Sequence, residues 1–464
     1  MKYTALVCQL VVITVFSMGC SEDTSGPPPP PRAHTQILWG KSAGGGNGDH
    51  GWGVATDGLE NVFVTGQFRD SATFNSTTLT SAGGDDVFVA EYDAAGNVLW
   101  ARSAGGAALD SGWGIATDVS GNVFVTGQFI DNADFGQTTL RSAGSADIFV
   151  VKYDAAGNVL WAKSAGGADT DYGYGVAPDG SGNVFLTGMF KASADFGDTT
   201  LTSAGDYDVF VAKHDAAGNV LWAKSAGGAD TDYGYGVAPD GSGNVFLTGT
   251  FKDSADFGDT TLTSAGRYDV FVAKYEAAGN VLWARSAGGA GPKEGWGAAT
   301  DGSGNVLVTG LFYTSASFGS TTLTSVGDGD VFVAKYDTAG NVLWARSGGS
   351  ASFDYGSGVA TDGSGNVFVT GTAWDGAIFG GTTLTSAGST DIFVAKYDAA
   401  GNVLWARSAG GAASDSGWGA ATDGSGNVLV TGDFRDSASF GGTTLTSAGG
   451  TDIFVVKIGP NGFE

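Results

Sequence analysis

The chain has few of the residues on which most catalytic and metal sites depend. It holds three histidines and two cysteines among 464 residues. Imidazole and thiolate groups are frequent metal ligands and catalysts, so such chemistry has few candidates here. The motif H-E-x-x-H and the P-loop lysine pattern are absent. Their absence argues against a zinc protease and a P-loop nucleotidase.

Positive charge is also scarce. The chain has 22 lysines and arginines against 48 aspartates and glutamates, which gives a formal net charge of −26. A surface this acidic repels phosphate backbones, so we expect no nucleic-acid partner.

The apolar segment near the N-terminus, residues 5–16, is too short to span a membrane. It has the length of the hydrophobic region of a signal peptide and ends in Ser17-Met-Gly-Cys20, which resembles the lipobox of bacterial lipoproteins. The sequence therefore predicts a lipoprotein-type signal peptide over residues 1–19 and lipidation of Cys20. Ordinary secretory cleavage nearby and an uncleaved anchor are the alternatives.

Cleavage before Cys20 also removes Cys8, so no thiol pair is left for a disulfide. Residues 20–36 contain the run Pro27–Pro31, which favours an extended, semi-rigid tether. Ser21 follows the cysteine, a pattern similar to that of lipoproteins sorted to the outer membrane. We expect an extracytoplasmic protein that is lipid-anchored at the outer membrane or cell surface.

Glycine, in contrast, is abundant, with 80 residues. There is no Gly-X-Y period, which excludes collagen, and the hydrophobic share of 42% is too high for a disordered chain. Instead, residues 38–464 consist of seven repeats of 61 residues. A Leu-Trp pair marks each repeat, with its tryptophan at Trp39, Trp100, Trp161, Trp222, Trp283, Trp344 and Trp405.

Each repeat has the pattern of four short strands, which in the second repeat are residues 112–118, 122–129, 147–153 and 158–164. Short Asp-to-Asn turns join the first strand to the second and the third to the fourth, which makes these neighbours antiparallel. The central strands are apolar on both faces, so each sheet needs other sheets packed against it. The sequence therefore predicts an all-β fold over residues 37–464, a seven-bladed β-propeller with blades of four antiparallel strands. A parallel β-helix is the alternative.

The chain is out of phase with these blades. It begins with a fourth strand at residues 37–42 and ends after a third strand at residues 452–457. We expect the N-terminal strand to complete the seventh blade and close the ring. The first strand of each repeat is rich in Gly and Ala and is expected nearest the axis. The fourth strand carries a repeated Lys or Arg, which suits an outer edge.

Two segments carry a family resemblance. Residues 362–371, DGSGNVFVTG, and residues 391–406, DIFVAKYDAAGNVLWA, resemble the SBBP (β-propeller) repeat family of bacterial surface and secreted proteins. The resemblance implies a β-propeller, and it implies no shared catalytic motif.

Two repeated positions near the expected axis are candidate ligand-binding sites. The first is acidic in six repeats, at Asp49, Asp110, Asp171, Asp232, Asp354 and Asp415. The second, three residues later, is aromatic in six repeats, at Trp52, Trp113, Tyr174, Tyr235, Trp296 and Trp418. Together they predict an acidic, aromatic-lined funnel for a sugar, a peptide or a cation, and the acids are candidate Ca²⁺ ligands. Alternatively, the aromatic rings pack between blades and the acids cap turns.

A catalytic residue is expected to break the repeat once. The residues that break it include His50, His214, Lys293, Glu294 and Ser357, and no two histidines have a metal-ligand spacing. We therefore expect a monomeric, non-enzymatic surface protein without a cofactor, calcium aside, whose propeller is a binding platform for a surface protein or polysaccharide. A lectin-like polysaccharide binder that uses the axial sites is the second hypothesis. A propeller lyase or hydrolase using His50 and Glu294 is the third.

Overall fold

The computed structural model describes residues 37–463. Every regular element among these residues is a β-strand, so the predicted all-β class is confirmed. No helix in this part of the chain is long and apolar enough to cross a membrane. The signal peptide predicted over residues 1–19, the lipidation of Cys20 and the tether over residues 20–36 lie outside the described residues.

The strands recur at the same four positions of each repeat. The first, or inner, strands are β2 (His50–Thr56), β6 (Ser111–Thr117), β10 (Tyr172–Pro178), β14 (Tyr233–Pro239), β20 (Lys293–Thr300), β24 (Tyr355–Thr361) and β30 (Ser416–Thr422). The second strands are β3 (Val62–Phe74), β7 (Val123–Phe135), β11 (Val184–Asp195), β15 (Val245–Phe251), β21 (Val306–Phe318), β25 (Val367–Trp374) and β31 (Val428–Phe440).

The third and fourth positions follow the same rule. The third strands are β4 (Thr77–Tyr92), β8 (Thr138–Tyr153), β12 (Thr200–His214), β18 (Asp269–Tyr275), β22 (Thr321–Tyr336), β28 (Thr390–Tyr397) and β32 (Thr443–Ile458). The outer strands are β1 (Ile37–Ala43), β5 (Val98–Gly106), β9 (Val159–Ala165), β13 (Val220–Ala226), β19 (Val281–Ala287), β23 (Val342–Gly348) and β29 (Val403–Ala409). The short strands β16 (Ser254–Asp256), β17 (Thr261–Thr263), β26 (Ile378–Phe379) and β27 (Thr382–Thr383) form two separate hairpins.

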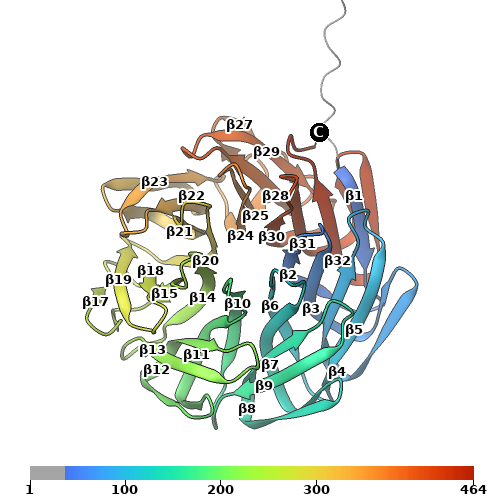
Figure 1. Ribbon diagram of the computed structural model, residues 1–464. Helices are drawn as coiled ribbons and strands as arrows, with labels where there is room; N and C mark the ends of the chain where they lie inside the picture. Colours follow the sequence, from blue (N-terminus) through green and yellow to red (C-terminus); the bar gives the residue numbers. More distant parts are fainter. Residues whose placement is uncertain (1–36, 464) are drawn as a thin grey trace, which may run out of the picture. The chain divides into compact units, whose positions relative to one another are not determined.

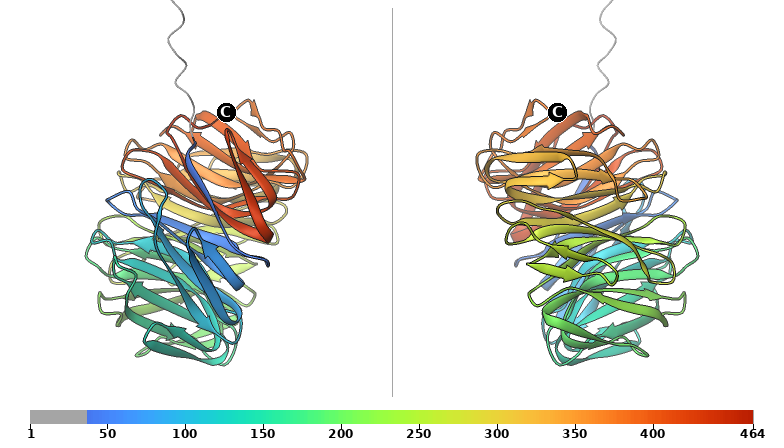
Figure 2. Two further views of the ribbon diagram at one scale, coloured as in Figure 1. Left: turned by 90° about the vertical axis from the view of Figure 1, so that its right-hand side faces the viewer. Right: turned by 90° about the vertical axis from the view of Figure 1, so that its left-hand side faces the viewer.

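Strands of one group pair antiparallel, from the inner strand through the second and third to the outer strand. Figure 1 shows the groups around a central axis, with the inner strands β2, β6, β10, β14, β20, β24 and β30 nearest to it. The side views in Figure 2 show twisted sheets stacked face to face. This stacking explains why the central strands are apolar on both faces, since each face is covered by the next sheet.

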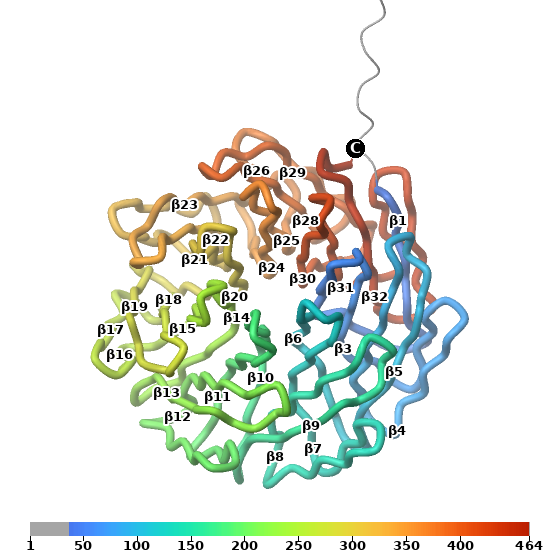
Figure 3. The backbone as a smooth tube through the Cα atoms, in the orientation of Figure 1, coloured from blue at the N-terminus to red at the C-terminus, as the bar shows by residue number. Residues whose placement is uncertain are grey.

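The outer strand of the last group comes from the other end of the chain. β1 pairs antiparallel with β32, from Ile37 opposite Ile458 to Ala43 opposite Ile453, in the sheet that also holds β31 and β30. In Figures 1 and 3 the blue β1 lies among the red strands of the last repeat. One buried cluster combines Val54 of the first repeat with Ile453 of the last.

The inner strands contact one another around the axis, including β30 with β2. Threonine hydroxyls join them: Thr117 Oγ1 donates to the carbonyl of Thr56 at 2.6 Å, and Thr56 Oγ1 donates to that of Thr422 at 2.7 Å. The same bond recurs at Thr422, Thr361 and Thr300. The third and fourth repeats have proline at this position, which supplies no hydroxyl.

The connection between the second and third strands is itself a strand pair. In five repeats the two strands continue as a ribbon to a tight turn, as β3 and β4 do around Asn75. A bulge at Asp70, which has a φ of 59°, bends this ribbon. The ribbon also bonds to the segment that follows the outer strand of the neighbouring sheet. For example, Thr73 of the ribbon bonds to Gly44, just after β1.

The outer strands also hold neighbouring repeats together. Each repeated tryptophan donates from Nε1 to a carbonyl in the turn of the next repeat, for example Trp39 to Ala94 at 3.0 Å and Trp283 to Thr338 at 3.1 Å. The repeated cations contribute as well, since Arg346 Nε donates to the carbonyl of Gly401 at 2.9 Å. Arg102, Arg346 and Arg407 thus bind the turn of the next sheet.

Candidate functional site

The two ends of the sheets carry different segments. We call the end with the turns 57–61 and 93–97 of the first repeat, and their equivalents, the turn end. The opposite end carries the connection from outer to inner strand, residues 44–50 in the first repeat, and the parts of the second and third strands beside it, residues 67–70 and 82–86. We call this the loop end. All twelve predicted ligand-binding residues lie at or next to the loop end.

The six predicted aspartates lie beneath the surface of the loop end. Asp49, Asp110, Asp171, Asp232, Asp354 and Asp415 are each 0% exposed. Both oxygens of Asp49 accept backbone hydrogen bonds, Oδ2 from Gly45 N at 2.7 Å and Oδ1 from Arg69 N at 3.0 Å. Equivalent bonds recur at the other five aspartates. These carboxylates hold the loop to the second strand, so they do not line a funnel as the sequence led us to expect.

Burial changes the acidity of these groups. It raises the pKa of Asp49, Asp110, Asp171 and Asp232 to about 7, and backbone hydrogen bonds oppose part of the rise. In the fifth repeat Lys293 holds the equivalent loop by donating hydrogen bonds to backbone carbonyls, whereas the aspartates accept them from backbone amides. Its Nζ donates to the carbonyls of Ala290 at 3.0 Å and Gly291 at 2.6 Å. The acid or lysine at this position therefore stabilises a loop in every repeat.

The six predicted aromatic residues are half-buried, and five of them contact another member of the set. In one arc, the ring centroid of Trp113 lies 4.9 Å from that of Tyr174, which lies 5.1 Å from that of Tyr235. In a second arc, Trp418 lies 5.0 Å from Trp52. The structure thus brings aromatic residues of successive repeats together around the axis, as the sequence predicted.

The sixth repeat has Ser357 at the aromatic position, yet the second arc continues through it. Tyr355, two residues earlier on β24, has its ring centroid 5.3 Å from Trp296 and 5.8 Å from Trp418. Ser357 Oγ instead donates to the carbonyl of Gly417 at 2.9 Å. Sequence reasoning missed Tyr355 because it looked for aromatic rings only at the position of Ser357, two residues later.

The second arc ends in a polar cluster around Asp433 on β31. Trp418 Nε1 donates to Asp433 Oδ1, and His50 Nδ1 lies 3.5 Å from the same oxygen. The ring of His50 stacks on Trp52 at 5.2 Å. Burial lowers the pKa of His50, but the nearby carboxylate of Asp433 outweighs it, and the pKa is raised.

Asp433 belongs to a position that varies from repeat to repeat, and sequence reasoning missed it. The residues there are Gln67, Gln128, Met189, Thr250, Leu311, Thr372 and Asp433. They pair across the sheet with His50, Ser111, Tyr172, Tyr233, Glu294, Tyr355 and Ser416, which vary as well. Comparing the seven repeats position by position would have found both sets. Divergence between repeats is therefore concentrated beside the aromatic arcs.

No group of three or more His, Cys, Asp or Glu residues within residues 37–463 has the arrangement of a metal site. The buried aspartates already accept backbone hydrogen bonds, so they offer few free lone pairs to a cation. Calcium binding at these acids stays a prediction.

Comparisons with known proteins agree with the repeat. Residues 347–379 match the SBBP family model, which is described as a beta-propeller repeat. The resemblance inferred from the sequence is thereby confirmed.

Two curated proteins are similar over longer segments. The WD repeat-containing protein L264 of Acanthamoeba polyphaga mimivirus is 26% identical over 407 residues, which cover 69% of this chain and 29% of that protein. Regulatory protein FlaEY of Caulobacter vibrioides is 26% identical over 171 residues, which cover 35% of this chain and 18% of that protein. The chain thus spans less than a third of the length of either relative. Among solved structures, the Pan2 WD40 domain of Neurospora crassa aligns over 76% of this chain and 90% of that domain, with 8% identity and a TM-score of 0.37.

Proposed function

Because the chain is a β-propeller repeat protein of the SBBP type, we propose that it is a non-enzymatic binding module with a seven-bladed ring that β1 closes. The pairing of β1 with β32 and the contact of β30 with β2 support this closure. A closed ring holds the loop ends of all blades in fixed positions around one axis. Such a platform suits recognition of a large surface ligand.

The aromatic arcs are the observation that carries this proposal. They place seven half-buried rings, one from each repeat, in contact within two arcs at the end where the repeats diverge. Aromatic side chains supply large contact areas with little loss of conformational entropy, and hydroxyl-bearing ligands stack on them. A polysaccharide is the ligand that the arcs favour, and a protein at the cell surface is the second candidate.

A glycan-array experiment tests the polysaccharide ligand. The purified protein is applied with calcium and then with a chelator. We expect binding to one sugar class that the Trp113→Ala/Trp418→Ala double variant loses at least tenfold. Trp374→Ala is the matched control, because it removes an exposed tryptophan outside both arcs.

Three outcomes separate the hypotheses. Equal retention by a double variant whose urea midpoint matches that of the parent would contradict a ligand site on the arcs. Loss of binding with the chelator alone would support calcium at the loop end. No binding to any glycan by folded protein would favour a protein partner, which pull-down from cell envelopes would then address.

We also propose that Cys20 carries the lipid that anchors the protein at the outer membrane or cell surface. Mass spectrometry of the N-terminal peptide is expected to show an acylated Cys20, and a Cys20→Ala variant is expected in the soluble extracytoplasmic fraction. An unmodified Cys20 at the mature N-terminus would refute the anchor.

A further inference from the structure

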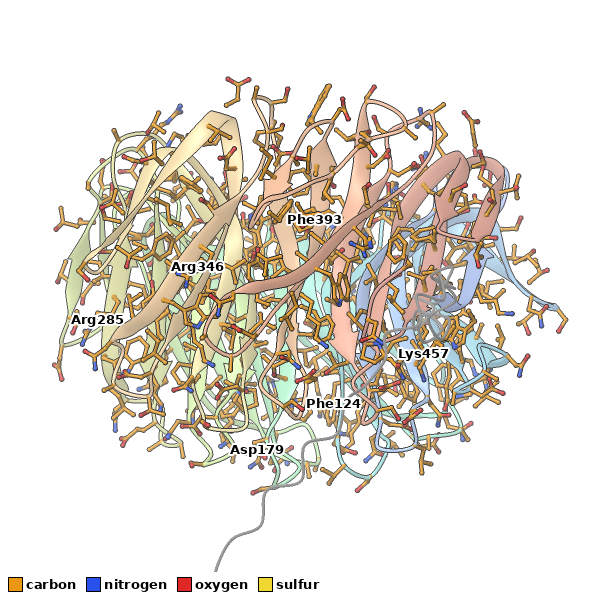
Figure 4. The ribbon with its side chains drawn as sticks, turned by 90° about the horizontal axis from the view of Figure 1, so that it is seen from above. Phe124, Asp179, Arg285, Arg346, Phe393 and Lys457 are labelled. Carbon is orange, nitrogen blue, oxygen red and sulfur yellow. The ribbon has the colours of Figure 1, made fainter. Side chains whose placement is uncertain are left out.

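A buried ion pair recurs at the turn end. In six repeats a lysine of the third strand reaches the aspartate that opens the first turn, with Nζ–Oδ2 distances of 2.7–3.8 Å. These pairs are Lys152–Asp118, Lys213–Asp179, Lys274–Asp240, Lys335–Asp301, Lys396–Asp362 and Lys457–Asp423. In four of them the ammonium also lies 4.6–4.7 Å from the centroid of a phenylalanine ring of the second strand. Figure 4 shows Phe124 and Asp179 toward the lower end of the sheets.

The first repeat replaces this lysine with an acid. Glu91 stands at the lysine position, opposite Trp100 on β5, and is 3% exposed. Burial raises its pKa to about 7, and the charge of Asp57 adds to the rise. No ion pair within residues 37–463 reaches Asp57 or Glu91, so this repeat has two neighbouring carboxyl groups where the others have a carboxylate and an ammonium.

Glu91 also lines a cavity of about 560 Å³ between the first and second repeats. Asp57 and Trp100 line it as well, together with Leu59, Leu99 and Val119, whose exposed fractions are 77%, 55% and 93%. The cavity thus combines two acidic groups with an apolar rim.

Three departures from the repeat meet at this cavity. Leu59 replaces a serine, Val119 replaces a glycine and Glu91 replaces a lysine, each present in the other six repeats. Leu59 and Val119 lie in two different turns and Glu91 lies on β4, yet all three line the same cavity. Substitutions that arose at random would be spread over the seven equivalent junctions between neighbouring repeats. These three are concentrated at one junction.

We propose that this cavity binds a primary alkylammonium group, the chemistry of a lysine side chain or a free amine. The ammonium lies between Asp57 and Glu91, over the ring of Phe63, which is the equivalent of Phe124 in the next repeat. It thus takes the position that a lysine of the chain itself occupies in the other repeats. Its alkyl stem contacts the side chains of Leu59, Leu99 and Val119. The site is at the turn end and is independent of the aromatic arcs.

Titration of the whole protein with n-butylammonium at pH 8, where Glu91 is ionised, tests the site. For a ligand this small we expect a dissociation constant on the order of millimolar by calorimetry, with a rise in melting temperature. Glu91→Gln is expected to weaken binding at least tenfold, and Glu91→Lys, which installs the residue of the other repeats, is expected to abolish it. Asp131→Asn is the control, since it removes one exposed acid elsewhere.

Further ligands define the chemistry. Neutral n-butanol must bind at least tenfold more weakly than n-butylammonium, because a neutral ligand gains nothing from the carboxylates. Tighter binding of Nα-acetyl-lysine amide identifies a lysine of a protein partner as the source, whereas equal binding identifies a free amine. Either result supports the site.

The proposal is overturned if n-butylammonium does not bind, if n-butanol binds equally well, or if folded Glu91→Gln binds as the parent does. Because Glu91→Lys is expected to fold at least as stably as the parent, its loss of binding cannot be attributed to unfolding. Trp113→Ala must leave amine binding unchanged, so failure here and failure of the proposed polysaccharide site are distinguishable.

Discussion

The turn end and the loop end of the propeller use carboxylates in opposite ways. At the turn end Asp301 accepts hydrogen bonds from backbone amides, Asn305 and Lys335, which together outweigh burial and lower its pKa. At the loop end Asp171 accepts two backbone bonds but has no cation, so burial dominates and its pKa rises to about 7. The turn end is also nearly identical in all repeats, whereas the residues beside the arcs change from repeat to repeat. In this protein, repetition marks the scaffold and divergence marks surfaces available to a ligand.

The largest expected effect comes from breaking a turn-end ion pair. Lys335→Ala leaves Asp301 buried without its cation, which costs about 3–5 kcal/mol of unfolding free energy. The loop-end pair of Arg69 with Asp85 is the comparison, since the Arg69 side chain is 54% exposed. Urea unfolding of Arg69→Ala is expected to give nearly the parent midpoint. A similar midpoint for both variants would contradict the difference between the ends.

A glycine at the turn end is expected to give the next largest effect. Gly279 has a φ of +86°, and an added Cβ would lie 2.8 Å from Cδ2 of Trp222. Gly279→Ala should therefore cost about 2–4 kcal/mol, from the left-handed backbone and the clash together. Gly46→Ala at the loop end, where nothing lies within 4 Å, should be nearly neutral by thermal denaturation. A costly Gly46→Ala would show that the loop end is packed as tightly as the turn end.

The contributions of the two ends to folding stability should depend on pH in opposite directions. The folded pKa of about 7 at Asp171 lies above its unfolded value, so its stabilising contribution is full below pH 4 and is lost as pH rises through 7. Asp301 has a lowered pKa, so its contribution is present above pH 4 and is lost at lower pH. We expect the melting temperature to be highest near pH 4 and to fall as the pH rises from 4 to 7. Asp171→Asn should make that fall smaller, and an unchanged slope would contradict the assignment.

The smallest effect on stability is expected when a residue at a varying position is replaced by the residue that another repeat has there. Tyr172→Ser introduces the residue that the second repeat has as Ser111, and it removes ring contacts with Trp113 at 5.5 Å and Tyr174 at 5.9 Å. The unfolding free energy should change by about 1 kcal/mol or less. Ligand retention on the array should change more than stability does. The reverse result would assign Tyr172 to the scaffold.

The strand positions could be predicted from the sequence because local chemistry determines them. The 61-residue period, the Asp-to-Asn turns and the apolar central segments indicated the order and direction of the strands in each repeat. The continuous length of the ribbons was not predicted, because a bulge at Asp70 interrupts the second strand. Beyond this bulge Ala72, Phe74 and Leu79 are buried between exposed polar residues, and this alternation is the signal of a further strand pair.

The candidate site was predicted in part. The aromatic position was found because six of the seven repeats have an aromatic residue there, whereas Tyr355 and Asp433 belong to positions that vary. The aspartates were located correctly along the chain, but spacing does not show whether a carboxylate points toward solvent or accepts backbone amides below the surface. Glu91 was missed because its significance comes from the lysine in the other repeats and from Asp57 in the turn that follows β2.

The origin of β1 has a mechanical consequence. Tension applied along the chain from before Ile37 enters the propeller at β1. That strand is held on two sides, by its pairing with β32 of the last repeat and by the bond of Trp39 to the turn of the first repeat. Load that enters at β1 is therefore shared between the last repeat, through β32, and the first repeat, through the turn that holds Ala94.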